Sequence, residues 1–178
     1  MVTSLVEQVS AIAEALDRSD IPWALGGALA LAYATREPRG TRDIDVNVFV
    51  SSSHCDEVFA ALPAGVRTSV ADRQVVENEE QVRLWWDSTP VDLFFASAPF
   101  HLEVAHRCRV VPFAGRTIRV LSAEDLAVFK AMFDRSKDWV DIETMIESGA
   151  LNVTTAAERL YELLGSDERV ERLRRLAG

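Results

Sequence analysis

Two aspartates one residue apart, Asp43 and Asp45, have the type and spacing to act together on a cation. They begin the apolar, β-branched run from Ile44 to Val50, which predicts a strand, and residues i and i+2 of a strand project from one face. Two carboxylates so close repel each other unless they are protonated or neutralised. A divalent ion such as Mg²⁺, which takes carboxylate and phosphate oxygens, removes that repulsion. A solvated strand edge is the more common explanation of an isolated Asp-x-Asp.

A third carboxylate, Asp92, lies inside the apolar segment Pro90 to Phe95. Carboxylates are rarely buried unless they are paired or bound to metal. If this segment is a strand beside Ile44–Val50, Asp92 joins Asp43 and Asp45, and three carboxylates can hold two metal ions for phosphoryl-type transfer. The alternative is a charge at the start of a strand, facing solvent. The sequence therefore predicts Mg²⁺ at Asp43, Asp45 and Asp92.

A pair of glycines, Gly26 and Gly27, separates a predicted short strand, 23–25, from a predicted helix that ends near Thr35. Backbone N–H groups at the N-terminus of a helix bind phosphate, and glycine allows a phosphate to approach the backbone closely. A tight turn that needs glycine dihedral angles explains the pair as well. Phosphate binding at this junction is the functional prediction.

Charged residues recur on two predicted helices near the C-terminal third. Lys130 is polar among apolar neighbours and is expected to reach a triphosphate, with Lys137 close behind it. Asp138 and Asp141 are one helical turn apart, so they orient the lysines or meet the nucleotide. The alternative is an intrahelical face of salt bridges.

The elements around these residues predict an α+β protein: a mixed sheet flanked by helices, followed by a C-terminal helical bundle. The predicted strands are 23–25, 44–50, 66–70, 81–86, 91–95, 108–113 and 117–120. The predicted helices are 3–18, 26–35, 54–62, 101–107, 123–134, 138–148, 154–164 and 167–176. We expect a catalytic domain at 1–120 and a helical domain at 121–178. Of the consecutive Trp85 and Trp86, one faces outward, to stack on a base or, by preference, to pack against the helical part.

The composition argues against several classes of protein. The net charge of −9 over 178 residues argues against sequence-blind binding of nucleic acid, although arginines cluster near residues 36–42 and 169–175. The spacing of Cys55 and Cys108 fits neither a metal site nor a disulfide framework. No apolar run is long enough to span a bilayer, and no secretory signal is expected. We expect a cytoplasmic protein with neither a membrane nor a disulfide partner.

Taken together, these residues resemble the nucleotidyltransferase superfamily related to DNA polymerase β. That family has a glycine motif that opens a helix, an aspartate pair on the next strand and a third carboxylate on a later strand. Within it, Gly26-Gly27 followed by Arg39-Gly40-Thr41-Arg42-Asp43-Ile44-Asp45 looks most like AbiEii-type toxins, including the MenT proteins. Their later motif is similar to Lys130, Arg135, Lys137-Asp138 and Asp141. Gly27 stands where many relatives have serine.

The resemblance implies transfer of a nucleoside monophosphate from a pyrimidine nucleoside triphosphate, CTP or UTP, to the 3′ end of tRNA, with a cognate antitoxin as restraint. Asp92 would be a metal ligand or the base for the attacking hydroxyl. The implied triphosphate and nucleotide contacts are Gly26, Gly27, Arg39, Thr41, Lys130, Lys137, Asp138 and Asp141. An antibiotic nucleotidyltransferase, favoured by the acidic net charge, and a non-catalytic nucleotide-binding module are the alternatives.

Overall fold

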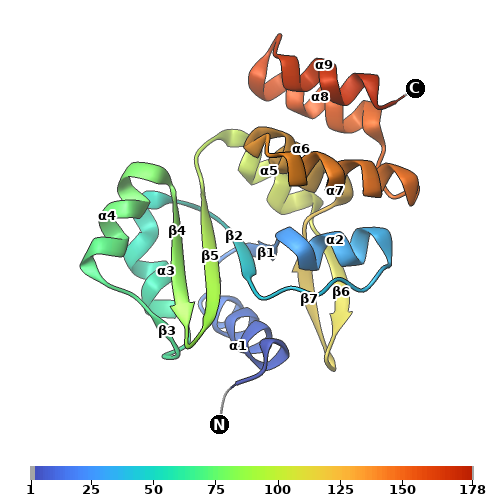
Figure 1. Cartoon of the computed structure of the whole chain (residues 1–178). Coiled ribbons are helices and arrows are strands. Elements are labelled where there is room, and N and C mark those ends of the chain that lie inside the picture. Colours follow the sequence, from blue (N-terminus) through green and yellow to red (C-terminus); the bar gives the residue numbers. More distant parts are fainter. Residues whose placement is uncertain (1–2, 178) are drawn as a thin grey trace.

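A seven-stranded mixed sheet forms the centre of the computed structural model, which describes residues 3–177 (Figure 1). The strands are β1 (Trp23–Leu25), β2 (Ile44–Ser51), β3 (Val66–Arg67), β4 (Gln81–Trp86), β5 (Thr89–Ala96), β6 (Arg109–Phe113) and β7 (Arg116–Val120). The α-helices are α1 (Leu5–Arg18), α2 (Gly27–Thr35), α3 (Cys55–Ala61), α4 (Val70–Glu79), α5 (Pro99–Arg107), α6 (Ala123–Phe133), α7 (Ser136–Glu147), α8 (Val153–Leu164) and α9 (Glu168–Arg175). A 3₁₀ turn, η1 (Ser52–His54), precedes α3. The predicted α+β class is confirmed.

The strands follow the order β3-β4-β5-β2-β1-β7-β6. β2 and β5 are parallel, while β4 pairs with β5, and β1 with β2, in antiparallel fashion. β1 joins the two parts of the sheet through a parallel contact between Leu25 and Val120. β2 therefore lies in the middle of the sheet, with β5 on one side and β1 on the other.

The two faces of β2 have different chemistry. Ile44, Val46 and Val48 are at most 1% exposed and pack into the core, as their alternation predicts. α1 packs on this core through Val9, Ile12 and neighbouring apolar residues, and its N-terminus is closed by the Ser4–Glu7 capping box. The opposite face of β2 carries Asp45 and Asn47, so polar side chains gather on the face away from this core.

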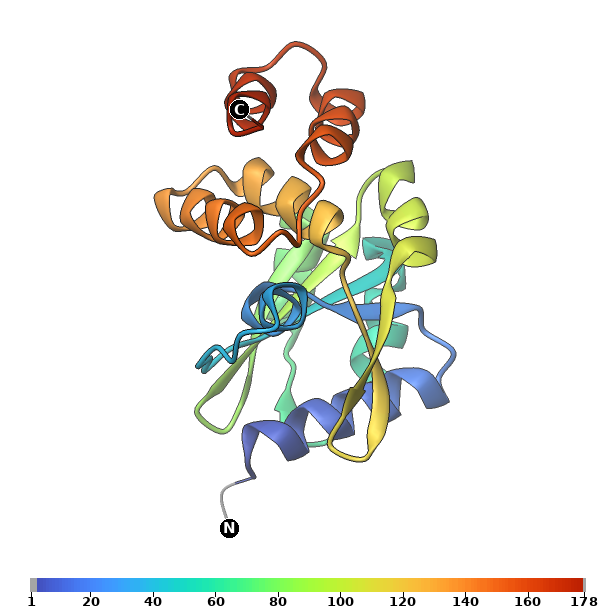
Figure 2. The same cartoon turned by 90° about the vertical axis from the view of Figure 1, so that its right-hand side faces the viewer.

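The helices after residue 122 stack in two layers beyond the sheet. Figure 2 shows α6 and α7 between the sheet and the α8–α9 pair, at the end of the molecule opposite α1. α6 and α7 both contact α2. The division into two domains at residue 120 stays a prediction.

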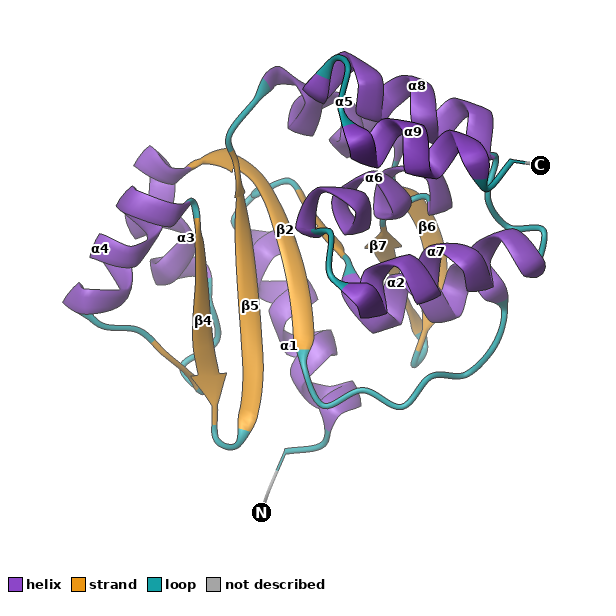
Figure 3. Ribbon diagram, turned by 45° about the horizontal axis from the view of Figure 1, so that its top comes forward, coloured by secondary structure: helices purple, strands orange, loops and turns teal. Residues whose placement is uncertain are grey.

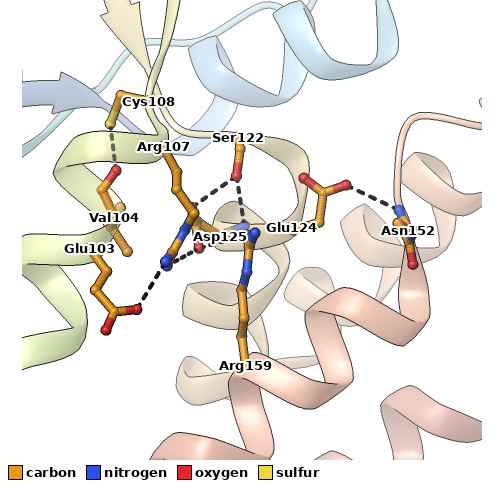
Figure 4. Close-up of polar contacts among 9 residues, drawn as sticks. All are labelled: Glu103, Val104, Arg107, Cys108, Ser122, Glu124, Asp125, Asn152 and Arg159. Carbon is orange, nitrogen blue, oxygen red and sulfur yellow. Dashed lines mark hydrogen bonds and ion pairs between the residues drawn. The ribbon is translucent and has the colours of Figure 1, made fainter.

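A buried charge network ties α5, α6 and α8 together around Asp125, whose side chain is 0% exposed (Figure 4). Arg107 donates two hydrogen bonds to its carboxylate, at 2.9 and 3.1 Å, and Arg159 donates one at 3.0 Å. The Ser122 hydroxyl donates another at 2.9 Å, and Ser122 also N-caps α6. Every oxygen of this carboxylate is thus satisfied by the chain itself.

One predicted strand is wrong beyond its first residues. Residues 66–70 were expected to be one strand, but β3 ends at Arg67, and the Ser69 side chain accepts a hydrogen bond from the Asp72 amide to N-cap α4. Helix α4 itself was not predicted, because most of its residues are polar and only Val76 is buried. Cys55 and Cys108 are free thiols. Within residues 3–177, no helix has both the length and the apolar character needed to cross a membrane.

Candidate active site

Three charged residues lie in one row across β4, β5 and β2. Asp92 on β5 is directly opposite Asp45 on β2 in the parallel pairing, and directly opposite Arg83 on β4 in the antiparallel pairing. Residues opposite one another in a sheet project from the same face. The structure therefore brings Asp92 beside Asp45, as the sequence predicts, and adds Arg83 to them.

The environment of Asp45 disfavours the ionised form of its carboxylate. Burial, and then the negative charges of Asp92 and Asp43, raise its pKa from 3.8 to about 6, while Lys130 and Arg83 counteract part of this rise. Among residues 3–177, its side chain receives no hydrogen bond and makes no ion pair. A cation placed beside Asp45 would therefore relieve a real electrostatic cost.

Asp92 is held by Arg83, which sequence reasoning missed. The Arg83 Nε and Nη2 atoms each donate a hydrogen bond of 2.7 Å to Asp92, and Nη2 lies 3.7 Å from an oxygen of Asp43. Asp92 is 15% exposed and Asp43 is 43% exposed. The signal was present in the sequence: the two-residue turn at Asp87-Ser88 sets a hairpin register that puts Arg83 opposite Asp92.

The glycine pair lies directly against this row. Gly27 has φ +52°, and a Cβ atom there would stand 1.9 Å from the Oδ2 atom of Asp45. The Gly26 amide donates a 2.9 Å hydrogen bond to the Asp45 carbonyl, so it is already occupied. The free first-turn amides of α2 therefore start at Gly27, because the first N–H groups of a helix lack intrahelical partners. Both glycines have a steric role, and phosphate binding here remains a prediction.

The later lysine and aspartates form a second cluster on α6 and α7. The Lys130 ammonium donates to Asp141 at 2.6 Å and lies 3.7 Å from Asp138. Burial alone would raise the pKa of Asp138, but the hydrogen bonds and charge of Arg135 lower it. Arg39, from the loop before β2, donates to Asp141 at 3.0 Å. The predicted Lys130, Arg39, Asp138 and Asp141 are thus brought together, and Lys130 also acts electrostatically on Asp45.

A pair of aromatic side chains, Phe94 and Phe133, connects the two clusters. Phe94, two residues after Asp92 on the same face of β5, meets Phe133 of α6 edge to face at 5.9 Å. The Arg135 guanidinium lies 4.8 Å from the centre of the Phe133 ring. The hydrogen bond to Asp138 raises the pKa of Arg135 against the effect of burial, and the negative charges of Asp138 and then Asp45 add to that rise.

Other predicted residues are not drawn into these contacts. Lys137 is exposed and, within the described chain, forms no ion pair. Thr41 makes only local hydrogen bonds with the backbone of Asp43, at 3.0 and 3.2 Å. Trp85 is 45% exposed on the same face as Arg83, so the preferred prediction that an outward tryptophan packs against the helices does not describe it. Trp86 points into the core.

The carboxylates fit a divalent cation by their chemistry. In the described part of the chain, no set of three acidic, histidine or cysteine side chains converges as a ready metal site. The guanidinium of Arg83 takes both oxygens of Asp92. Asp45 keeps both oxygens available, Asp43 has only the 3.7 Å ion pair with Arg83, and the raised pKa of Asp45 marks the place where positive charge is missing. Release of Asp92 from Arg83 would complete a three-carboxylate set.

The chain matches the model of a known protein family. A family model described as "Nucleotidyl transferase AbiEii toxin, Type IV TA system" matches residues 11–177. No curated protein matches the chain.

Two solved structures share the fold. The crystal structure of ANT(2″)-Ia in complex with adenylyl-2″-tobramycin is similar with a TM-score of 0.60 and 18% identity, over 97% of this chain and 96% of that one. The lincosamide antibiotic adenylyltransferase LnuA, with lincomycin bound, is similar with a TM-score of 0.52 and 14% identity, over 81% of this chain and 96% of that one.

Proposed function

The chain belongs to the AbiEii nucleotidyl transferase toxin family, and from that premise we propose that it transfers a nucleoside monophosphate from a pyrimidine nucleoside triphosphate to the 3′ end of tRNA, with Mg²⁺, in the cytoplasm. The observation that carries the proposal is the pairing of Asp45 with Asp92 on adjacent strands, with the backbone of Gly27 packed against the Asp45 carboxylate. This arrangement joins paired acids, a helix N-terminus and a nearby lysine in one place. Such a set suits the transfer of a nucleotidyl group.

In the proposed reaction the 3′ hydroxyl of the acceptor attacks the α-phosphorus of CTP or UTP, and pyrophosphate leaves. Asp43 and Asp45 would hold Mg²⁺, which when bound offsets the negative charge of the phosphates. Asp92, once released from Arg83, would join as a ligand or accept the proton of the attacking hydroxyl. Two hydrogen bonds from Arg83 hold Asp92 in place until substrate arrives.

The triphosphate would lie between α2 and α6. Amide groups from Gly27 onward point out of the N-terminus of α2, where the helix dipole favours negative charge. Lys130 is the nearest cation of α6, and Arg39 enters from the loop before β2. Both now share Asp141, so a triphosphate would compete with that carboxylate for two cations. Exposed Lys137 is free to meet a distal phosphate.

A toxin of this family implies a cognate antitoxin that restrains the enzyme. We include this partner in the proposal on the strength of the family alone. Co-expression with the neighbouring gene and recovery of growth would identify it.

The direct test incubates the purified protein with total tRNA, Mg²⁺ and each labelled nucleoside triphosphate in turn. We expect label at the 3′ end of tRNA with CTP or UTP. Chelation of divalent ions should remove the signal. Label that enters a small molecule, and never tRNA, would overturn the proposal.

A second candidate acceptor is a small cationic, hydroxylated molecule, because the net charge of −9 favours a cation at long range. The dependence of binding and turnover on salt concentration distinguishes the two acceptors. Binding of RNA should weaken steeply as salt increases, since phosphate contacts release counterions, whereas turnover of a small substrate should change less.

A further inference from the structure

The outward face of β3 and β4 extends the candidate active site towards an edge of the sheet. Figure 3 shows β4, β5 and β2 side by side with no helix across the face turned to the viewer, while α1 lies behind them. Trp85 follows Arg83 by two residues on β4 and so projects from the same face. Arg67 on β3 is directly opposite Trp85. This face is continuous with the row that holds Asp92 and Asp45.

Its chemistry differs from that of the chain as a whole. The side chains that β3 and β4 present on this face are Arg67, Gln81, Arg83 and Trp85. They include two cations and no acid, in a chain with a net charge of −9. Arg83 is engaged with Asp92, but Arg67 makes no ion pair within residues 3–177. An exposed indole beside two arginines suits a nucleobase and its phosphates.

The position of this face also agrees with the direction from which the acceptor hydroxyl would attack the α-phosphorus. The triphosphate is assigned to the side of the carboxylates next to Gly27 and Lys130. In a phosphoryl-type transfer the attacking and leaving oxygens are roughly in line. The acceptor hydroxyl therefore approaches from the opposite side of Asp45, across Asp92, where β4 and β3 lie.

We propose that Arg67 and Trp85 form the docking surface for the single-stranded 3′ end of the RNA acceptor. A terminal base stacks on Trp85, Arg67 binds a backbone phosphate, and the 3′ hydroxyl is directed to Asp92. This inference rests on the proposed function, because it assumes an RNA acceptor.

Kinetics with tRNA test the roles of the two residues. Trp85→Ala should raise the KM for tRNA by between about 5-fold and 150-fold, the range of one lost base stack, with the KM for the nucleoside triphosphate unchanged. Trp85→Phe should restore most of the loss, because phenylalanine keeps an aromatic face. Arg67→Gln should reduce the slope of log affinity against log salt by about 0.7, as loss of one phosphate contact to a single strand requires.

Two controls separate docking from general surface effects. Tyr161→Ala removes an aromatic side chain that is 46% exposed on α8, and Arg109→Gln removes an exposed arginine on β6. Neither should change the KM for tRNA or the salt slope. Unfolding midpoints of all variants check that the fold is intact.

Binding without catalysis distinguishes failure of the surface from failure of the proposed function. Fluorescence anisotropy of a labelled, short single-stranded RNA with a free 3′ hydroxyl should show binding to the wild type that Trp85→Ala weakens. If the wild type binds this RNA through Trp85 but transfers no label to tRNA, the docking surface stands and the proposed function fails. If Trp85→Ala binds RNA as the wild type does, or lowers kcat with the KM for tRNA unchanged, the docking surface is wrong.

Discussion

Asp125 is a fully buried carboxylate and Asp45 a partly buried one, and their surroundings are opposite. Asp125 accepts hydrogen bonds from Arg107, Arg159 and Ser122, and its side chain has no exposed surface. The charges that act most strongly on Asp45 are those of Asp92 and Asp43, and burial with their repulsion raises its pKa to about 6. The chain neutralises one acid completely and leaves the other short of positive charge.

This difference separates a structural ion network from a site prepared for substrate. A buried acid that its own chain satisfies holds elements together, here α5, α6 and α8. A buried acid that lacks a partner costs folding free energy, and the cost is recovered only when an external cation arrives. The comparison therefore predicts opposite results when the two acids are replaced.

The largest effect is expected for Asp45→Asn on catalysis. Loss of a carboxylate that is proposed to hold Mg²⁺ should lower kcat on the order of 10³-fold, since charge stabilisation of the transition state would depend on it. Transfer of labelled nucleotide to tRNA measures this. Mg²⁺ should also raise the melting temperature of the wild type and not that of the variant. Unchanged transfer by Asp45→Asn would favour a non-catalytic module instead.

Asp125→Ala should mainly affect stability. It leaves Arg107 and Arg159 without their shared acid, and breaking a buried ion pair on one side costs about 3–5 kcal/mol. Urea unfolding followed by circular dichroism measures the loss. Glu103→Ala, which removes an acid that is 64% exposed and also paired with Arg107, should change stability by less than about 0.5 kcal/mol. Equal losses for both variants would contradict the comparison.

Gly27→Ala tests whether the position of the Asp45 carboxylate depends on the absence of a side chain at residue 27. The added Cβ would stand 1.9 Å from the Asp45 carboxylate oxygen, so the carboxylate must move, and a displacement of this kind costs about 10²-fold in kcat. Gly115→Ala is the matched control, because Gly115 also has a positive φ, +82°, but no atom lies near the added Cβ. The control should lose some stability and keep its kcat. A similar kcat for both variants would show that Asp45 need not be held in place.

The smallest effect is the pH dependence of stability at Asp45. The pKa of this acid is raised on folding, from 3.8 to about 6. Its contribution to stability is therefore complete below 3.8 and is lost as the pH rises through about 6. Without divalent ions, Asp45→Asn should be more stable than the wild type by about 2–3 kcal/mol near neutral pH, and equally stable in acid. Unfolding curves across pH measure this, and a wild type as stable as the variant at neutral pH would contradict it.

The sequence predicted those parts of the site that depend on local pattern. Asp45 and Asp92 interrupt apolar strands, so their alignment followed once both strands were placed side by side. Arg83 was missed because its role depends on the register of a hairpin, which one residue of shift would reverse. The place of Lys137 at the triphosphate stays a prediction, since its side chain is exposed, while Arg135 at the start of α7 reaches Asp138. Contacts between distant elements, such as that of Arg39 with Asp141, are set by packing that no local pattern records.

The short strand β1 has a consequence for the order of events during synthesis. β1 gains its second neighbour only through the contact of Leu25 with Val120, and Lys130 follows later still. Contacts between residues far apart in the chain form late, because closing the intervening loop costs entropy. A nascent chain thus carries its carboxylates without the lysine that completes them. The site proposed for catalysis is therefore assembled only after the chain has been made beyond Lys130.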